Sequence, residues 1–370
     1  MLFVSPTLAS DRPVPVSRTD FERMFEFSNT IYRLKHQEVY ARLLENKLPE
    51  TAKPRPDTPG ILMGFDFHLT DDGPKLIEIN NNAGGLYIGP HTNADGESQP
   101  WLPQPDMGEL PGDIETRLLE MFPKVWKNIA IVDEGIENQF MFPEMQAYAE
   151  LLERDDRNVF LLSPEALQWR DQPNERGLYF NQHRLDGIYN RHTDFYLDSV
   201  AMQDIKKAYM AGFIQLNPHP RSYALLGDKA RMADWWHEGL LESCLSASEI
   251  HLIRQIVPEI HLMNECNDEK AWQERKNWVF KPSARHGGKG VLLGKAMSRK
   301  RFDALDRTDT VMQKFVPASV VMLHDQAFKF DVRLFTQGEK LIAVAGRVWQ
   351  GQVTNFRTEG SGWVPLEIKG

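Results

Sequence analysis

Lys75-Leu76-Ile77-Glu78-Ile79-Asn80 is the most informative stretch of this chain. Its mixture of apolar and polar residues is typical of a half-buried strand, in which side chains two apart point to the same face. Glu78 and Asn80 therefore share one face of the predicted strand, while Ile77 and Ile79 point to the other.

A second predicted strand, Gly64-Phe65-Asp66-Phe67, precedes this stretch, and the intervening Asp72-Gly73 is a strong hairpin signal. The two strands together present the carboxylates of Asp66 and Glu78 and the amide oxygen of Asn80 on one surface. Hard oxygen ligands of this kind suit Mg²⁺ that carries a nucleotide phosphate. Acidic residues on a strand also occur where that face is merely exposed to solvent, so these two strands by themselves do not establish a metal site.

Lys281 ends another predicted strand and is followed by a loop that contains Gly287, Gly288 and Gly290. Glycines let backbone N–H groups approach phosphate oxygens closely, and a lysine supplies a point charge for a phosphate. The loop is not a P-loop, because no Lys-Ser/Thr pair and helix follow it. An ordinary glycine-rich hairpin is the alternative.

Arginines recur on the last predicted strands. Asp331 and Arg333 share a strand face opposite Val332, and Arg347 lies on the next strand, with Asn355 in the segment after it. An arginine at such a site can neutralise a phosphoryl group in transfer. Taken singly, each of these charges would be interpreted as part of a surface ion pair.

The patterns along the chain predict three units. Residues 19–46 have the apolar spacing of one amphipathic helix, and strands alternate with helices between 128 and 216, which is typical of a parallel, Rossmann-like sheet. We therefore expect an α/β (α+β) protein divided into 1–112, 113–224 and 225–370. The first strand of the middle unit lacks Gly-x-Gly-x-x-Gly, so no dinucleotide site is expected there.

Composition narrows the class of protein. The 370 residues are 41% apolar and 26% charged, with a net charge of -9, which argues against a partner such as nucleic acid. No apolar run approaches the roughly 20 residues of a membrane-spanning helix, and the start does not resemble a signal peptide. The two cysteines, Cys244 and Cys266, indicate neither a disulfide framework nor a zinc site. We expect a cytoplasmic protein without a membrane partner.

Taken in order, these elements resemble the ATP-grasp superfamily of carboxylate–amine ligases, and glutathione synthetase in particular. In that family the glycine-rich flap, hinge strand, Asp-x-Arg strand and arginine strand come first, and the metal-binding hairpin comes last. Here the hairpin comes first, so the chain looks like a circularly permuted member with a Rossmann-like domain before its first lysine. The resemblance covers about 1–85 and 225–370.

The resemblance implies ATP and one or two Mg²⁺ ions as cofactors, and it implies a role for each matching residue. The expected metal ligands are Asp66, Glu78 and Asn80, and the expected catalytic residues are Arg333, Arg347 and Asn355. The expected nucleotide contacts are Lys229, Lys281, Gly287, Gly288, Gly290, Gln313, Lys314, Val316 and Asp331.

Two points are less well defined by the sequence. Many members of the family carry a glutamate where Gln313 stands, so adenine would be recognised by backbone groups of the hinge. For the substrates, Asn82 is expected to line the acceptor pocket, and Arg191 either clamps a substrate carboxylate or forms a structural salt bridge with Asp194.

The activity implied by the resemblance is amide or peptide bond formation through an acylphosphate, with release of ADP and phosphate. An ATP-dependent phosphotransferase and a non-catalytic nucleotide-binding regulator are the alternatives. The partners would be a small carboxylate and a small amine, and family analogy suggests a homodimer. The sequence identifies neither substrate.

Overall fold

The hairpin predicted around Glu78 is present in the computed structural model. Strands β2 (Met63–Thr70) and β3 (Gly73–Asn80) are antiparallel, and Asp66 lies directly opposite Glu78. Gly73 follows the two turn residues with a φ of +92°, a backbone conformation that a residue without a Cβ adopts at little cost. The structure describes residues 9–10, 12–56, 58, 62–87, 91–92, 98–99, 112–284, 290–323, 325–352, 354 and 360–370.

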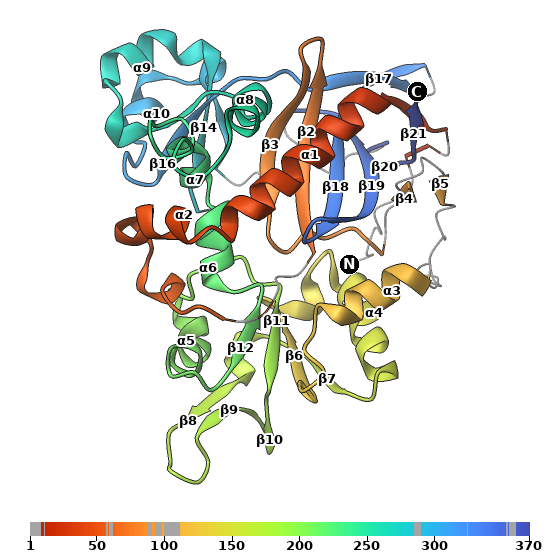
Figure 1. Ribbon diagram of the computed structural model, residues 1–370, viewed down its shortest axis with the longest axis vertical. Coiled ribbons are helices and arrows are strands. Elements are labelled where there is room, and N and C mark those ends of the chain that lie inside the picture. The colour runs from red at the N-terminus through yellow and green to blue at the C-terminus, as the bar shows by residue number, and fades with distance from the viewer. Residues whose placement is uncertain are drawn as a thin grey trace.

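The largest sheet joins the front of the chain to its end (Figure 1). Strand β18 (Gln326–Gln337) lies between β2 and β19 (Lys340–Trp349) and is antiparallel to both. Helix α1 (Arg18–Lys35) crosses one face of this sheet, and the ring of its Phe27 packs edge-on against Phe65 and Phe67 of β2. Segments from opposite ends of the sequence thus share one hydrophobic core. The other elements around this sheet are β1 (Val14–Ser17), α2 (Glu38–Leu43), β4 (His91–Thr92), β5 (Ser98–Gln99), α3 (Gly112–Glu120), β17 (Ser319–Leu323), β20 (Gly362–Val364) and β21 (Leu366–Lys369).

The middle of the chain forms the parallel sheet that the sequence predicts. Its strand order is β12-β11-β6-β7, and all three strand pairs are parallel. The Rossmann-like prediction is thereby confirmed. This unit lies below the large sheet in Figure 1 and comprises β6 (Asn128–Val132), α4 (Phe142–Arg154), β7 (Asn158–Leu162), β8 (Gln168–Arg170), β9 (Gly177–Phe180), β10 (His183–Arg184), β11 (Gly187–Asn190), α5 (Gln203–Met210) and β12 (Gln215–Asn217).

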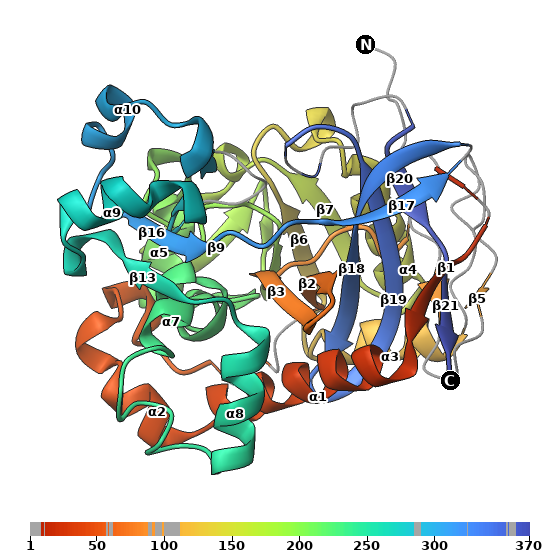
Figure 2. The same cartoon turned by 90° about the horizontal axis from the view of Figure 1, so that it is seen from above.

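A smaller antiparallel sheet, in the order β13-β16-β14-β15, carries the predicted lysine strand. Figure 2, which views the molecule from above, shows strands β13 and β16 of this sheet to one side of the β2–β3 hairpin. Side chains at their N-terminal ends cap several of the helices around this sheet. Ser246 and Glu249, for example, form a capping box that starts α8. The elements are α6 (Pro220–Ser222), the π-helical turn η6 (Tyr223–Gly227), α7 (Lys229–Asp234), α8 (Ala247–Ile256), β13 (Ile260–Leu262), α9 (Asp268–Glu274), β14 (Trp278–Pro282), β15 (Leu292–Leu293), α10 (Arg299–Asp303) and β16 (Thr310–Lys314).

One prediction from the sequence, that of a single long helix near the N-terminus, was wrong. The single helix expected over residues 19–46 is two helices, because α1 ends at Lys35 and α2 begins at Glu38. The N–H of His36 bonds back to the carbonyl of Arg33, which tightens the last turn. After this break, the hydroxyl of buried Tyr40 donates to the carbonyl of Leu225, so α2 turns toward a second neighbour.

The division of the chain at 112/113 and 224/225 stays a prediction. The parallel pairing of β1 with β21 does bring the first and last described strands side by side. Within the described residues, no helix combines the length and the apolar character needed to cross a membrane.

Leu334 tests the shared core. This β18 residue lies opposite Phe65 of β2 and Val344 of β19 and is fully buried. We expect Leu334→Ala to lower the free energy of unfolding by about 2–5 kcal/mol, because it leaves a cavity between strands from both ends of the chain. Urea denaturation measures the change. Leu43→Ala is the matched control, since Leu43 is 50% exposed, and an equal loss in both variants would contradict the packing.

Candidate active site

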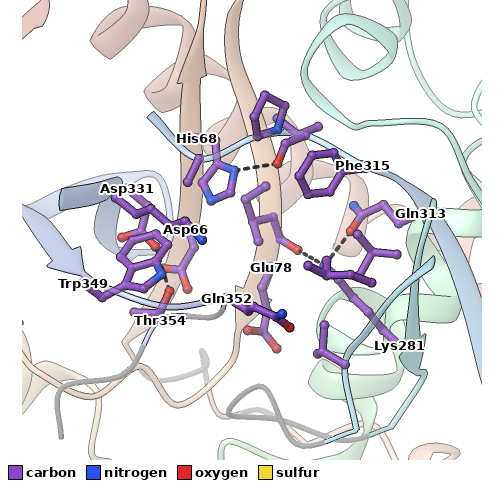
Figure 3. Close-up of a pocket in the computed structure, with 18 of the residues that line it drawn as sticks. Asp66, His68, Glu78, Lys281, Gln313, Phe315, Asp331, Trp349, Gln352 and Thr354 are labelled. Carbon is purple, nitrogen blue, oxygen red and sulfur yellow. Dashed lines mark hydrogen bonds between the residues drawn. The ribbon is translucent and has the colours of Figure 1, made fainter. Parts of the chain in front are cut away.

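The large and small sheets enclose a cavity of about 640 Å³. Figure 3 shows Lys281 and Gln313 of the small sheet on one side, and Asp66 and Asp331 of the large sheet on the other. The cavity therefore joins the front-end hairpin to the strands from the second half of the chain.

Charged residues on the large-sheet wall pair across neighbouring strands. Arg333 lies opposite Asp66 in register, and its Nε and Nη2 donate to the two carboxylate oxygens at 2.6 and 2.7 Å. Arg347 lies opposite Asp331 and binds it in the same bidentate way at 2.7 and 2.8 Å. The same Nη2 of Arg347 that binds Asp331 also lies 2.9 Å from Asp66, so both arginines share that carboxylate. Strand register accounts for the two opposed pairs, and the contact of Arg347 with Asp66 links β19 to β2 past the strand between them.

The network sets the ionisation of its members. Burial by itself disfavours a charged Asp66, but Arg333 and Arg347 outweigh that effect and hold the pKa of this carboxyl below its usual range. Arg347 is likewise buried, and Asp331 and Asp66 raise its pKa above the ordinary value. Asp66 and Arg347 are therefore charged at neutral pH.

Two buried lysines face this wall. Lys229, the first residue of α7, places its Nζ 3.2 Å from Glu78. Lys281 donates to the Gln313 side-chain oxygen at 2.6 Å and to the carbonyl of Ile77 at 3.2 Å. Because it is buried, the pKa of Lys281 falls to about 8, although Glu78 opposes the shift.

The lining suits a ligand that is anionic and rich in hydrogen-bond acceptors. Gln313 and Trp349 line the cavity, and their Nε2 and Nε1 donors are buried without a partner among the described residues. An apolar portion of the lining, including Val279, Leu293 and Phe315, is suited to a planar ring. Basic side chains outnumber carboxylates in the described lining, where Lys229, Lys281, Lys295, Lys314, Lys329, Arg333 and Arg347 stand against Asp66, Glu78 and Asp331.

The donor set also fits Mg²⁺, provided that phosphates supply the remaining ligands. Within the described residues no group of three or more histidine, cysteine or acidic side chains could hold a metal ion. The two carboxylates of Asp66 and Glu78 do lie opposite each other, and Asn80 donates to Asp66 at 3.2 Å. Mg²⁺ is commonly bound by one or two carboxylates together with substrate phosphates rather than by a cage made only of protein groups.

Solved structures share this architecture. A glutathione synthetase-like effector of Globodera pallida aligns over 96% of this chain and 89% of its own length, with a TM-score of 0.58 and 12% identity. The chain has a glutathione synthetase-like ATP-grasp fold. A protein provisionally named gamma-glutamylcysteine synthetase, from Methylobacillus flagellatus, aligns over 97% of this chain and 90% of its own, with a TM-score of 0.53 and 12% identity. No protein-family model matches the sequence. No curated protein matches it either.

The ATP-grasp fold brings most of the predicted site residues into one cavity. Gly290 is described but is not part of the lining; it has a φ of +80° and lies beside Pro282. Gly287, Gly288 and Asn355 lie outside the described residues. The predicted residues that line the cavity are Asp66, Glu78, Asn80, Lys229, Lys281, Gln313, Lys314, Val316, Asp331, Arg333 and Arg347.

The two predicted substrate residues, Asn82 and Arg191, do not line this cavity. Arg191 is 8% exposed, and its Nη1 donates to the carbonyl of Asn82 at 2.8 Å and to the Tyr189 hydroxyl at 3.1 Å. The alternative salt bridge with Asp194 is not found; that carboxylate accepts from the N–H groups of Ser199 and Asp198.

In this structure the side-chain oxygen of Gln313 accepts a hydrogen bond from Lys281, so it is engaged with that lysine rather than open to a ribose hydroxyl. The hinge backbone is partly engaged as well. The N–H groups of Lys314 and Phe315 donate to the carbonyls of Glu259 and Asn277, and His68 Nδ1 lies 3.2 Å from the Val316 carbonyl oxygen. A base would therefore be recognised by the remaining hinge groups.

Sequence reasoning missed the aromatic part of the lining. His68 and Trp349 stack with ring centroids 6.3 Å apart, and both line the cavity. Each stands two residues after a predicted site residue, Asp66 and Arg347, so strand alternation was the available signal. Thr354 had no such signal, because it lies in an irregular segment, and its hydroxyl donates to Asp331 at 3.3 Å.

The lowered pKa of Lys281 gives a pH test. Its ammonium loses the proton as pH rises through about 8, so nucleotide affinity should be constant at lower pH and weaken above that value. Lys281→Arg should remove this step, because arginine stays protonated. Titration with a fluorescent nucleotide across the pH range measures both. Lys276→Arg, at an exposed position, should keep the step, and a step that survives in Lys281→Arg would assign it to another group.

Proposed function

We propose that this protein is an ATP-dependent carboxylate–amine ligase that uses Mg²⁺. One observation carries the proposal: the carboxylates of Asp66 and Glu78 and two arginines lie on one wall of a single cavity, and two buried lysines face that wall. Such a cavity complements a metal-bound triphosphate, because it offers cations to the phosphates and hard oxygens to the metal. The glutathione synthetase-like fold supports the same class of reaction by analogy.

The proposed roles follow from position. Asp66, Glu78 and Asn80 would hold one or two Mg²⁺ ions, which neutralise phosphate charge when bound. Lys229 and Lys281 would contact the phosphates from the opposite wall. The segment around Gly287, Gly288 and Gly290 remains the predicted flap, and Asn355 the predicted residue of the second loop.

The arginines are proposed to act on the reacting groups. A substrate carboxylate would attack the terminal phosphorus, giving an acylphosphate and ADP, and an amine would then displace phosphate to form the amide. Arg333 and Arg347 would stabilise the negative charge that develops in both steps, since each presents a planar guanidinium at the cavity wall. No covalent bond to the protein is needed, so catalysis rests on positioning and charge.

Glu78→Gln tests the metal assignment. The amide keeps the size of the side chain but removes a charged ligand, so we expect turnover to fall by at least about 100-fold in a protein that still folds. ADP release measures the activity. Glu367→Gln removes an exposed strand glutamate that pairs with Lys369 at 3.2 Å, and it should leave the rate unchanged. A Glu78→Gln variant as active as the wild type would rule out this ligand.

The reaction class is tested with substrates. The protein is incubated with Mg·ATP and a panel of small carboxylates and amines, and products are identified by mass. A ligase gives ADP and an amide, and hydroxylamine should trap the activated acid as a hydroxamate. Phosphorylated product formed without any need for an amine would instead identify a phosphotransferase, and saturable ATP binding without turnover would identify a regulator.

A further inference from the structure

The turn that follows the β2–β3 hairpin, the predicted metal-binding hairpin, is hydrogen-bonded to neighbouring elements on both of its sides. It consists of residues 81–85 and follows β3 directly. On the cavity side, Arg333 Nη1 donates to the carbonyl oxygen of Gly84 at 3.0 Å. On the other side, the turn rests on the Rossmann-like unit, through residues that do not line the cavity. The turn is thus the connection between that unit and a proposed catalytic arginine.

Glu144 of α4 provides the strongest of these contacts. Its two carboxylate oxygens accept from the N–H of Gly85 at 3.0 and 2.9 Å, and one also accepts from the N–H of Tyr87 at 3.3 Å. The side chain is 1% exposed, and burial raises the pKa of its carboxyl despite these bonds. A buried carboxylate is costly unless its oxygens are satisfied, so this one is committed to the backbone of residues 85–87.

Arg191 holds the start of the same turn. Its guanidinium donates to the carbonyl of Asn82, while the Asn82 side chain donates back to the carbonyl of Arg191 at 3.3 Å. Packing around the turn is equally tight. A Cβ placed on Gly84 would lie 2.8 Å from Met141 and 2.9 Å from the Arg191 guanidinium. The Gly84 carbonyl therefore has little freedom to move.

Arg333 depends on that carbonyl in a specific way. Two of its three nitrogens bind Asp66, the carboxylate also proposed as a metal ligand, and only the third binds the turn. A metal ion that binds the Asp66 carboxylate would weaken the two hydrogen bonds from Arg333 to that carboxylate. The Gly84 carbonyl is then the contact that keeps the guanidinium aimed at the reacting groups.

We propose that Glu144 is a positioning residue for the ligase reaction, acting through the Gly84–Gly85 peptide to orient Arg333, with Arg191 holding the other end of the turn. The inference rests on the proposed function. A purely structural Glu144 would stabilise the fold without a selective effect on the chemical step.

Glu144→Gln is the test. Its amide keeps one acceptor oxygen but turns an N–H donor toward the N–H of Gly85 in place of the second oxygen, so the turn should shift while the volume of the side chain is kept. We expect kcat to fall about 10- to 100-fold, with the KM for ATP within about 2-fold of the wild type. Asp186→Asn is the matched control. Asp186 also accepts two backbone N–H bonds in the Rossmann-like unit, from Lys127 and Asn128, but it does not contact the turn.

A double-mutant cycle identifies the route of the effect. If Glu144 acts through Arg333, then Glu144→Gln added to Arg333→Lys should lower kcat by no more than about 2-fold beyond Arg333→Lys alone. Asp186→Asn should leave kcat near the wild-type value in either background. Should Glu144→Gln fold poorly, Arg191→Lys loosens the same turn and should show the same selective loss and the same non-additivity.

An unchanged kcat in Glu144→Gln would overturn the positioning role. So would a double variant whose loss of kcat equals the product of the losses in the two single variants, Glu144→Gln and Arg333→Lys. A wild-type protein without any turnover would be a different result, because it would refute the proposed function and the positioning role with it.

Discussion

The register of β2 against β18 is the constraint on which the site depends. It sets Asp66 opposite Arg333, while the pairing of β2 with β3 sets Asp66 opposite Glu78. A shift of β2 by one residue would turn Asp66 toward the core and Phe65 or Phe67 toward the cavity. The packing of those two rings on Phe27 makes that shift costly, so the hydrophobic core specifies the position of the charges.

Two aspartates and two arginines on the large-sheet wall form ion pairs with one another. Asp66 and Asp331 pair with Arg333 and Arg347, so three buried ionic groups and the partly buried Arg333 stabilise one another. The same arrangement implies an exchange of partners during the proposed reaction. A cation that binds Asp66 would weaken its hold on both arginines and make them available to an anionic substrate, which couples metal binding to the readiness of the catalytic groups.

Local patterns in the sequence predicted the parts of the site that lie on strands. Alternation placed Glu78 with Asn80 and Asp331 with Arg333, and the glycine-rich loop marked Lys281. The same patterns could not predict the break after Lys35 or the role of Arg191, because both depend on contacts with distant segments. Glu144 illustrates the limit most clearly, since nothing in α4 indicates that its carboxylate binds a turn 59 residues earlier in the chain.

The central claim is that the front hairpin and the basic strands form one site for a metal–nucleotide complex. Electron paramagnetic resonance of Mn²⁺, used in place of Mg²⁺, tests it most directly, because the signal of free Mn²⁺ is lost on binding. The account predicts weak Mn²⁺ binding to the protein alone and, once ADP or ATP is added, tight and saturable binding of one or two ions to the protein, seen as a loss of free signal beyond that caused by the same nucleotide without protein. Mn²⁺ binding that is unaffected by nucleotide would contradict it.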